Sequence, residues 1–362
     1  MKIVVIGGSI AGIACALRLQ GSGHSVSILE RRFSDAAGGF GMVMDASTNR
    51  ALQNLGVSLQ GSAHEISRYR VHDLSSDIQS QQALDGCSGI SRQRLMQEMR
   101  DQLRPGTILY GAEFDRFIHD SSGRVKAAAL KAGSIIEADL FIAADGVRSR
   151  IREKYVPGPE LTPVKSVEVV GVSQFAETPP ELIGTFKKLL RSREGAAMGM
   201  VPTADHQVVW YFQWDIRRWP QALLDNHERK AWLKKELQSW PAQVRKIVSK
   251  EDLYDSHLWR TTDRDLPSRF HRGNVVLVGD AAHPLLTFTS QGVGSALEDG
   301  LLLGDALEGI NPASIEQIER SLSSFASERL PILQQRLDGG RSLQRQFLGL
   351  ESQSLDRVPV CA

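Results

Sequence analysis

The hexapeptide Gly-Gly-Ser-Ile-Ala-Gly at residues 7–12 constrains the fold of this chain more than any other stretch. It follows a β-branched run at residues 2–6, which is typical of a buried parallel strand. It also opens a stretch with helical spacing that should end at Gly21 or Gly23. A second strand is predicted at residues 25–30, which completes a βαβ unit. This context favours a dinucleotide-binding α/β fold.

The residue types of this turn suit a pyrophosphate. Gly7 allows the tight turn, and Gly12 lets the helix approach the strand. The amides around Ile10 and Ala11 open the helix, and a helix N-terminus attracts phosphate. Ser9 stands where the middle glycine of such turns usually lies, and its hydroxyl could donate to a phosphate oxygen. We therefore predict that this turn contacts the cofactor phosphates.

An acidic residue at the end of the second strand is the expected ribose ligand. Glu30 holds that position. Arg31 and Arg32 follow it and are also assigned to the cofactor site; they could hold the 2′-phosphate of NADP, although Glu30 would repel it. The alternative is an ordinary strand–helix turn followed by solvated charges.

Two further apolar stretches end in a carboxylate beside a glycine. Asp145-Gly146 ends the predicted strand at 139–146, and Gly279-Asp280 ends another that begins near residue 275. A buried carboxylate is costly without hydrogen-bond donors. Ligands of open α/β sheets lie outside the carboxyl ends of the strands, where the hydroxyls of an extended polyol could donate to Asp280.

These stretches together resemble the FAD-dependent aromatic hydroxylases of the p-hydroxybenzoate hydroxylase type, the single-component group. The resemblance rests on GGSIAG, ADLFIAADGVRSRIR and GNVVLVGDAAHPLLTFTSQGVGSALEDG, in that order. It implies an α/β fold in which a Rossmann-like FAD-binding domain is interrupted by a β-rich substrate domain with a mixed or antiparallel sheet, followed by C-terminal helices. The implied division is 1–68, 90–164 and 262–312 for the FAD-binding domain, 69–89 and 165–261 for the substrate-binding domain, and 313–362 for the C-terminal helical segment.

The resemblance also implies roles for individual residues. Arg92 would contact the phosphate and ribityl side of FAD, and Asp280 would bind the ribityl hydroxyls. Residues 292–294 would present amides to the flavin, and the glycine-rich strand that contains Gly39 and Gly41 would pass beside its ring. The full set of predicted cofactor-binding residues is Gly7, Ser9, Ile10, Ala11, Gly12, Glu30, Arg31, Arg32, Gly41, Met42, Arg92, Asp145, Gly146, Gly279, Asp280, Gly292, Val293 and Gly294.

The implied reaction is a monooxygenation. NAD(P)H would reduce FAD, and reduced FAD would react with O2 to give a C4a-hydroperoxide that hydroxylates or epoxidises a small aromatic or other electron-rich compound. No second dinucleotide fingerprint is present, so the nicotinamide is expected to bind transiently. Thr287 and Ser290 depart from the family pattern in the loop near the flavin. A reductase or oxidase on the same scaffold therefore stays open as an alternative, and so does a non-catalytic binding protein.

The residues of the substrate site are less clear from the sequence. Trp210, Phe212, Trp214 and Met200 are candidates for its lining, with core packing as the alternative. No catalytic base is assigned, because His64, His72, His206 and His257 belong to no motif. His283 is expected to support its loop.

Composition excludes several other classes. The net charge of +1 gives no bulk attraction to nucleic acid. The three cysteines, Cys15, Cys87 and Cys361, are far apart and fit neither a disulfide framework nor a metal site, so a cytoplasmic location is expected. No apolar run approaches the roughly 20 residues of a membrane span. The substrate, the choice between NADH and NADPH, and the oligomeric state are left open.

Overall fold

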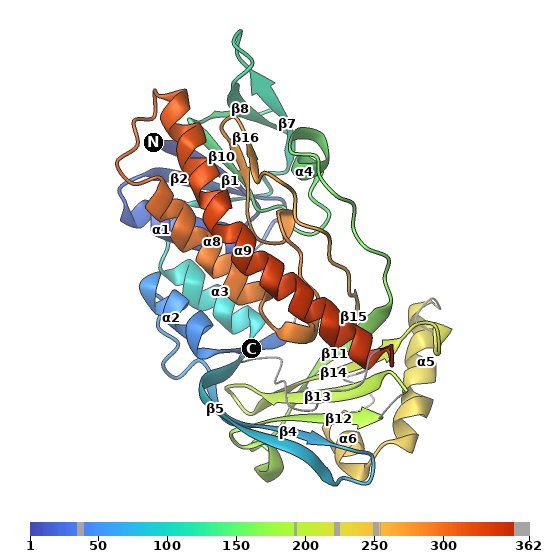
Figure 1. Cartoon of the computed structure of the whole chain (residues 1–362). Helices are drawn as coiled ribbons and strands as arrows, with labels where there is room; N and C mark the ends of the chain where they lie inside the picture. The colour runs from blue at the N-terminus through green and yellow to red at the C-terminus, as the bar shows by residue number, and fades with distance from the viewer. Residues whose placement is uncertain (35–39, 192–193, 221–224, 249–252, 254, 351–362) are drawn as a thin grey trace.

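The computed structural model describes residues 1–34, 40–191, 194–220, 225–248, 253 and 255–350, and Figure 1 gives their arrangement. Gly39 lies outside the described residues. Two large sheets form the body of the molecule, with helices grouped beside each of them. None of the helices in the described residues is long and apolar enough to cross a membrane.

The first sheet has six strands in the order β16-β17-β10-β1-β2-β6. Its neighbours pair in parallel, except that β16 runs antiparallel to β17. This is the Rossmann-like sheet expected from the sequence. Its strands are β1 (Lys2–Ile6), β2 (Ser25–Glu30), β6 (Ile108–Tyr110), β10 (Leu140–Ala143), β16 (His271–Arg272) and β17 (Val275–Leu277).

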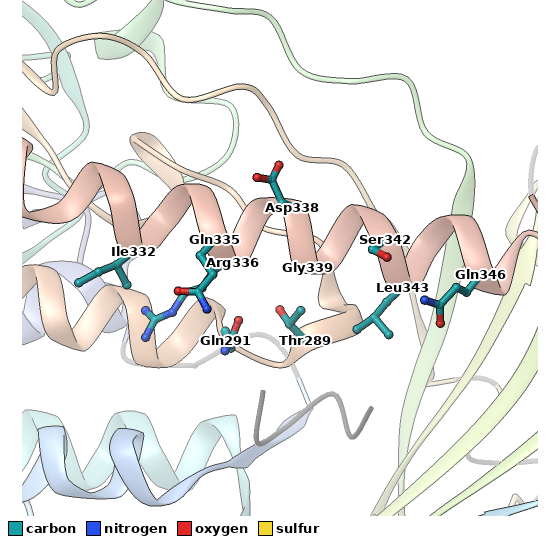
Figure 2. A pocket seen from close by; sticks show the side chains of 10 residues that line it. All are labelled: Thr289, Gln291, Ile332, Gln335, Arg336, Asp338, Gly339, Ser342, Leu343 and Gln346. Carbon is teal, nitrogen blue, oxygen red and sulfur yellow. The ribbon is translucent and has the colours of Figure 1, made fainter. Parts of the chain in front are cut away.

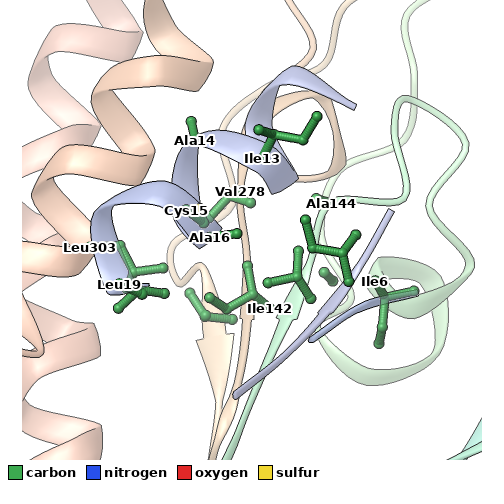
Figure 3. Packing of buried hydrophobic residues seen from close by; sticks show 14 of the residues in the cluster. Ile6, Ile13, Ala14, Cys15, Ala16, Leu19, Ile142, Ala144, Val278 and Leu303 are labelled. Carbon is green, nitrogen blue, oxygen red and sulfur yellow. The ribbon is translucent and has the colours of Figure 1, made fainter. Parts of the chain in front are cut away.

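Two helices, α1 (Ile10–Gly21) and α8 (Gly292–Ala306), pack together over this sheet. Figure 3 shows Ile13 and Ala16 of α1 beside Ile142 of β10 and Val278, which follows β17. All four are buried. Because α1 buries such small residues, its N-terminus lies close to the carboxyl ends of the strands, where a ligand is expected.

The second sheet has eight strands in the order β15-β11-β14-β13-β12-β4-β5-β3. It is antiparallel apart from the parallel pair of β12 with β4, so the expected β-rich region is a mixed sheet. Its strands are β3 (Gly41–Met44), β4 (His64–His72), β5 (Ile78–Ser91), β11 (Ser166–Gln174), β12 (Thr185–Arg191), β13 (Ala196–Pro202), β14 (Gln207–Asp215) and β15 (His257–Arg260).

Sheet membership differs from the division expected from the sequence. The strand β3 and all of β4 join the second sheet, although residues 1–68 were expected in the first region. The reason is β5, which is 14 residues long and pairs with β4 and with β3. The chain therefore changes sheets by residue 41, and the domain boundaries themselves stay a prediction.

A third, three-stranded sheet was not predicted from the sequence. It consists of β7 (Phe114–His119), β8 (Val125–Leu130) and β9 (Ile135–Glu137). Phe117 of this sheet makes edge contacts with Phe141 of β10 and with Tyr155. The third sheet thus extends the core of the first.

The C-terminal region of the described chain is the single long helix α9 (Ile315–Phe347), which runs beside α8 and reaches toward the second sheet (Figure 1). The buried Arg329 joins the two helices by ion pairs with Glu298 and Asp299. The remaining helices are α2 (Ala46–Asn54), α3 (Arg92–Asp101), α4 (Arg150–Tyr155), α5 (Asn226–Glu236) and α6 (Ala242–Ile247), with 3-10 turns η1 (Pro180–Leu182), η3 (Leu237–Ser239), η4 (Gly279–Ala281) and η5 (Thr287–Thr289).

Candidate active site

A cavity of about 370 Å³ lies between the two large sheets. Its lining combines elements from distant parts of the chain: the start of α1, the strand β3, the beginning of α3, the loop after β17 and the first turn of α8. The predicted cofactor-binding residues on its lining are Ser9, Ile10, Ala11, Gly41, Met42, Arg92, Gly146, Asp280, Gly292 and Val293.

The turn between β1 and α1 admits only glycine at two positions. A Cβ on Gly7 would lie 2.2 Å from the carbonyl oxygen of Ala144, and φ there is +112°. A Cβ on Gly12 would lie 2.0 Å from the carbonyl oxygen of Gly7. Neither glycine lines the cavity, but together they bring α1 and β10 close enough for the amides at the start of α1 to face it.

A side chain from α3 braces the same turn. Arg92 donates from Nη2 to the hydroxyl oxygen of Ser9 over 2.5 Å. Burial lowers the pKa of Arg92, while the nearby charge of Asp280 raises it. The guanidinium therefore lies within electrostatic reach of both the turn and Asp280, and it would add positive charge beside a bound pyrophosphate.

Glu30 holds the turn in place. Its Oε2 accepts a hydrogen bond of 2.9 Å from the amide of Gly8, and its Oε1 accepts one of 2.9 Å from the amide of Arg32. Each oxygen keeps a second lone pair for a ribose hydroxyl. Arg31 and Arg32 are exposed, and neither lines the cavity.

The carboxylate of Asp280, which follows Gly279 after the end of β17, has no hydrogen-bond donor among the described residues. The side chain of Asp280 opens onto the cavity and accepts no hydrogen bond there. Its surroundings raise its pKa through desolvation, while His283 and Arg92 lower it. Hydroxyl groups of a bound polyol would supply the donors that this carboxylate lacks, so the residues present fit the ribityl chain of FAD.

The buried side chain of Asp299 fixes the loop that carries Asp280. It accepts hydrogen bonds from the amide of Gly279 over 2.7 Å, from His283 Nε2 over 2.6 Å and from Arg329 Nε over 2.8 Å. His283 is 2% exposed, in keeping with the supporting role expected of it. Gly279 faces Ala11 instead of the cavity, since a Cβ there would lie 2.6 Å from the Cβ of Ala11.

The first turn of α8 faces the cavity at Gly292 and Val293. Gly294 lies outside the lining, and a Cβ on it would meet Thr48 Oγ1 at 2.6 Å. Ser290 adopts a left-handed backbone conformation with φ of +54°, a conformation that favours glycine. The N-terminal turns of α1 and α8 thus face the same cavity, and the backbone amides of both turns are oriented toward it.

Asp145 is a further predicted residue that does not line the cavity. Its Oδ2 accepts from the amides of Arg150 (3.0 Å) and Ile151 (3.4 Å) at the start of α4. Burial raises its pKa, and these hydrogen bonds lower it. Its Oδ1 is buried without a partner among the described residues. Gly146, next to it, does line the cavity.

The opposite wall of the cavity is the face of the second sheet that carries Val209, Tyr211 and Gln213 of β14. The expectation for Trp210, Phe212, Trp214 and Met200 is resolved in favour of core packing. All four are at most 1% exposed and pack against Leu233 and Trp240 on the other side of the sheet. Residues at even positions of β14 share one face, so the three aromatic candidates turn away together.

Several lining residues had no motif to reveal them. Glu168 and Val170 come from β11, and Phe186 and Lys188 come from β12. The available signal was Glu168, an isolated acid within the apolar run Ser166–Gln174. No histidine lines the cavity, and the described residues hold no group of three metal-ligating side chains.

A second hollow, of about 350 Å³, lies along α9 near the start of α8. Figure 2 shows it bounded by side chains of α9, such as Arg336 and Gln346, facing Thr289 and Gln291. It contains none of the predicted cofactor-binding residues. The candidate active site is therefore the cavity between the sheets.

The fold and the cavity are typical of flavoproteins in which a dinucleotide-binding α/β unit faces a large mixed sheet. The chain belongs to the FAD-binding domain family, whose model matches residues 1–354, and thus to the FAD-dependent monooxygenases of the aromatic hydroxylase type. It is 28% identical to Monooxygenase 1 of Arabidopsis thaliana, covering 94% of this chain and 90% of that protein.

Two further comparisons agree with that assignment. The chain is 26% identical to 6-hydroxynicotinate 3-monooxygenase of Pseudomonas fluorescens, over 85% of this chain and 83% of that protein. The crystal structure of Klebsiella pneumoniae HpxO complexed with FAD and uric acid has the same fold, with a TM-score of 0.84 at 22% identity, over 96% of this chain and 89% of that one.

Proposed function

We propose that this protein uses NAD(P)H and O2 to hydroxylate or epoxidise a small aromatic or other electron-rich compound in the cavity between its two sheets. The observation that carries the proposal is the composition of that cavity. One wall consists of the strand-end turns and helix starts that suit FAD, and the other is a side-chain face that suits a small ligand.

Each group of residues has its part in the proposed reaction. Bound FAD supplies the electron transfer and oxygen chemistry. The amides at the start of α1, together with Arg92, hold the pyrophosphate, and Asp280 accepts the ribityl hydroxyls. Gly292 and Val293 present the N-terminus of α8, which stabilises negative charge on the reduced cofactor.

The apolar part of the second sheet keeps water away from the reaction. Val170, Phe186, Val201 and Val209 line this part of the cavity. Excluding water strengthens the polar contacts inside the site and protects reactive species from hydrolysis. We also propose that Asp145 and Gly146, which follow β10 near the edge of the same site, serve both FAD and the transiently bound nicotinamide. A cytoplasmic location stays a prediction from the cysteine content.

A reductase or an oxidase is the second candidate function, favoured by the loop before α8. Thr287 and Ser290 replace the usual residues there, and Ser290 retains a left-handed backbone. Their side chains line the cavity and change its polarity near the start of α8. A reductase would consume NAD(P)H without using O2 for product formation.

One experiment separates these functions. Purified protein loaded with FAD is mixed with NADH or NADPH under argon, and flavin bleaching is followed; then ¹⁸O2 is admitted together with a panel of small aromatic compounds. Monooxygenation predicts a product that gains one ¹⁸O atom. Reduction of a panel compound in a parallel mixture kept under argon would instead establish a reductase. Oxidation of a panel compound without ¹⁸O incorporation, with hydrogen peroxide as the oxygen product, would establish an oxidase.

A further inference from the structure

The cavity-facing side of the second sheet is divided into a polar row and an apolar row. Glu168 of β11 pairs in register with Gln213 of β14, and both line the cavity. Val209 and Val201, which pair with each other further along β14 and β13, line its apolar part. Along the strands, a ligand on this face therefore passes from a polar row to an apolar row.

Glu168 has one oxygen occupied and one free. Its Oε1 accepts hydrogen bonds of 2.5 Å from both Gln213 Nε2 and Thr287 Oγ1. Its Oε2 receives none from the described residues, although the residue is only 6% exposed and lines the cavity. Burial raises the pKa of Glu168, while Thr287, Lys188 and Gln213 lower it. An unmatched acceptor in such a place costs free energy until a donor arrives.

Lys188 is the cationic counterpart on β12. Its side chain lines the cavity and forms no hydrogen bond or ion pair within the described part of the chain. Burial lowers the pKa of Lys188 to about 8, and the charge of Glu168 raises it. Its neighbour Lys187 points to the opposite side of the strand, where its Nζ donates to Gln243 Oε1.

Tyr211 covers the sheet between these two groups. The row next to Glu168 pairs Val170 with Tyr211, Tyr211 with Gly199, and Gly199 with Lys188. The Tyr211 ring lies over Gly199. A Cβ on Gly199 would lie 2.1 Å from the nearest ring atoms of Tyr211. Glu168 and Lys188 stand three strand spacings apart, roughly 14 Å between backbones, and their side chains shorten that gap.

We propose that Glu168 and Lys188 select an aromatic substrate that carries an O–H or N–H donor at one end and an anionic oxygen at the other. Glu168 Oε2 accepts the donor, Lys188 binds the anionic oxygen, and the ring lies over Tyr211 between them. The inference rests on the proposed function, since it assigns the substrate class of the same cavity. A ligand without the donor leaves Glu168 unmatched, and a ligand without the anion leaves Lys188 unmatched.

Four small probes test this selection on the FAD-loaded protein. 6-Hydroxynicotinate carries both features, 6-methoxynicotinate lacks the donor, 2-hydroxypyridine lacks the carboxylate, and 2-methoxypyridine lacks both. Dissociation constants are measured from the change in flavin absorbance on titration. We expect the wild type to bind 6-hydroxynicotinate at least about tenfold more tightly than each singly altered probe, since each lost contact leaves a polar group unpaired.

Two variants assign the preferences to their residues. Glu168→Gln should turn an amide N–H toward the cavity, because its oxygen still accepts from Gln213 and Thr287. It should therefore lose the preference for hydroxy over methoxy probes and keep the preference for the carboxylate. Lys188→Met should lose the preference for the carboxylate and keep the preference for hydroxy over methoxy probes. Lys187→Met, on the opposite face of the same strand, is the matched control and should keep both preferences.

The possible results are distinguishable. If the wild type binds FAD but shows neither preference, or binds none of the probes, the assignment of the substrate class is wrong while the proposed monooxygenase function survives. The same holds if both variants keep the wild-type preferences. If the protein does not take up FAD at all, the proposed function itself fails, and the substrate assignment falls with it.

Discussion

The two large sheets use their residues in different ways. In the six-stranded sheet, the groups that face the cavity are backbone amides and turns at strand ends, held by glycines such as Gly7 and Gly12. In the eight-stranded sheet, they are side chains such as Glu168 and Tyr211, which stand in the middle of strands. A turn of fixed shape needs a fixed local sequence, whereas a side-chain face needs only the right alternation. Sequence motifs therefore identify the cofactor side of the cavity, whereas strand register determines which side chains form its ligand side.

The largest effect on cofactor binding should come from the glycine turn of the first sheet. Gly12→Val places a side chain where even a Cβ would lie 2.0 Å from the carbonyl oxygen of Gly7. Because the turn must open, we expect FAD affinity to fall by at least about 100-fold, or about 2.7 kcal/mol. Titration of FAD-free protein with FAD measures this.

The matched control for that variant is Gly21→Val, at the end of the same helix, where an added Cβ would have no neighbour within 4 Å. It should bind FAD like the wild type. Retained FAD affinity in a folded Gly12→Val protein, judged by circular dichroism, would show that the turn does not hold the cofactor.

The next effect concerns the network that fixes the Asp280 loop. Asp299→Asn removes the negative charge that pairs with the buried guanidinium of Arg329. We therefore expect a loss of about 3–5 kcal/mol in the free energy of unfolding. Asp305→Asn on the same helix is the control; its carboxylate is exposed and pairs with Arg18, which predicts a loss below about 1 kcal/mol. Urea denaturation of each protein gives both values.

The same network predicts an acid dependence. Burial raises the pKa of Asp299, but the charges of His283 and Arg329 outweigh it, so that the pKa lies below its usual value. The stabilisation is present above the unfolded-state pKa and is lost as pH falls through the folded-state pKa. The free energy of unfolding should therefore fall less steeply with acidification in Asp299→Asn than in the wild type. Equal slopes would contradict this account of the loop.

A smaller and more local effect is expected in the second sheet. Gly199→Val would displace the Tyr211 ring and fill part of the cavity floor. We expect a stability loss of about 1–3 kcal/mol and 6-hydroxynicotinate binding at least about tenfold weaker, with FAD affinity unchanged. A parallel loss of FAD affinity would contradict the claim that the first sheet binds the cofactor and the second sheet binds the ligand.

The smallest predicted effect is a pH dependence of ligand affinity. With a pKa of about 8, Lys188 is charged below that pH and neutral above it. The affinity for 6-methoxynicotinate should therefore fall, by at most about tenfold, as the pH rises from about 7 to about 9, since its carboxylate stays ionised. Glu168 and Tyr211 line the same cavity, and the charge of Glu168 raises the pKa of Lys188. The trend should therefore shift to lower pH in Glu168→Gln and disappear in Lys188→Met.

The difference between the sheets also explains what the sequence could predict. The strands β1 and β2, the helix α1 and the cavity-lining residues of the first sheet follow from glycine spacing and apolar runs. The lining of the second sheet does not, because Trp210 and Tyr211 are equally plausible until the buried face is known. Asp145 illustrates a further limit: its motif does not reveal that its Oδ2 accepts hydrogen bonds from the amides of Arg150 and Ile151.

The most direct test of the account is a crystal structure of the protein with bound FAD. The account predicts electron density for FAD that passes from Glu30 along the Gly7–Gly12 turn, with its ribityl chain at Asp280 and its ring system beside Gly41 and Gly292. FAD bound elsewhere, or a cavity between the sheets in which the Asp280 carboxylate meets no part of the cofactor, would contradict it.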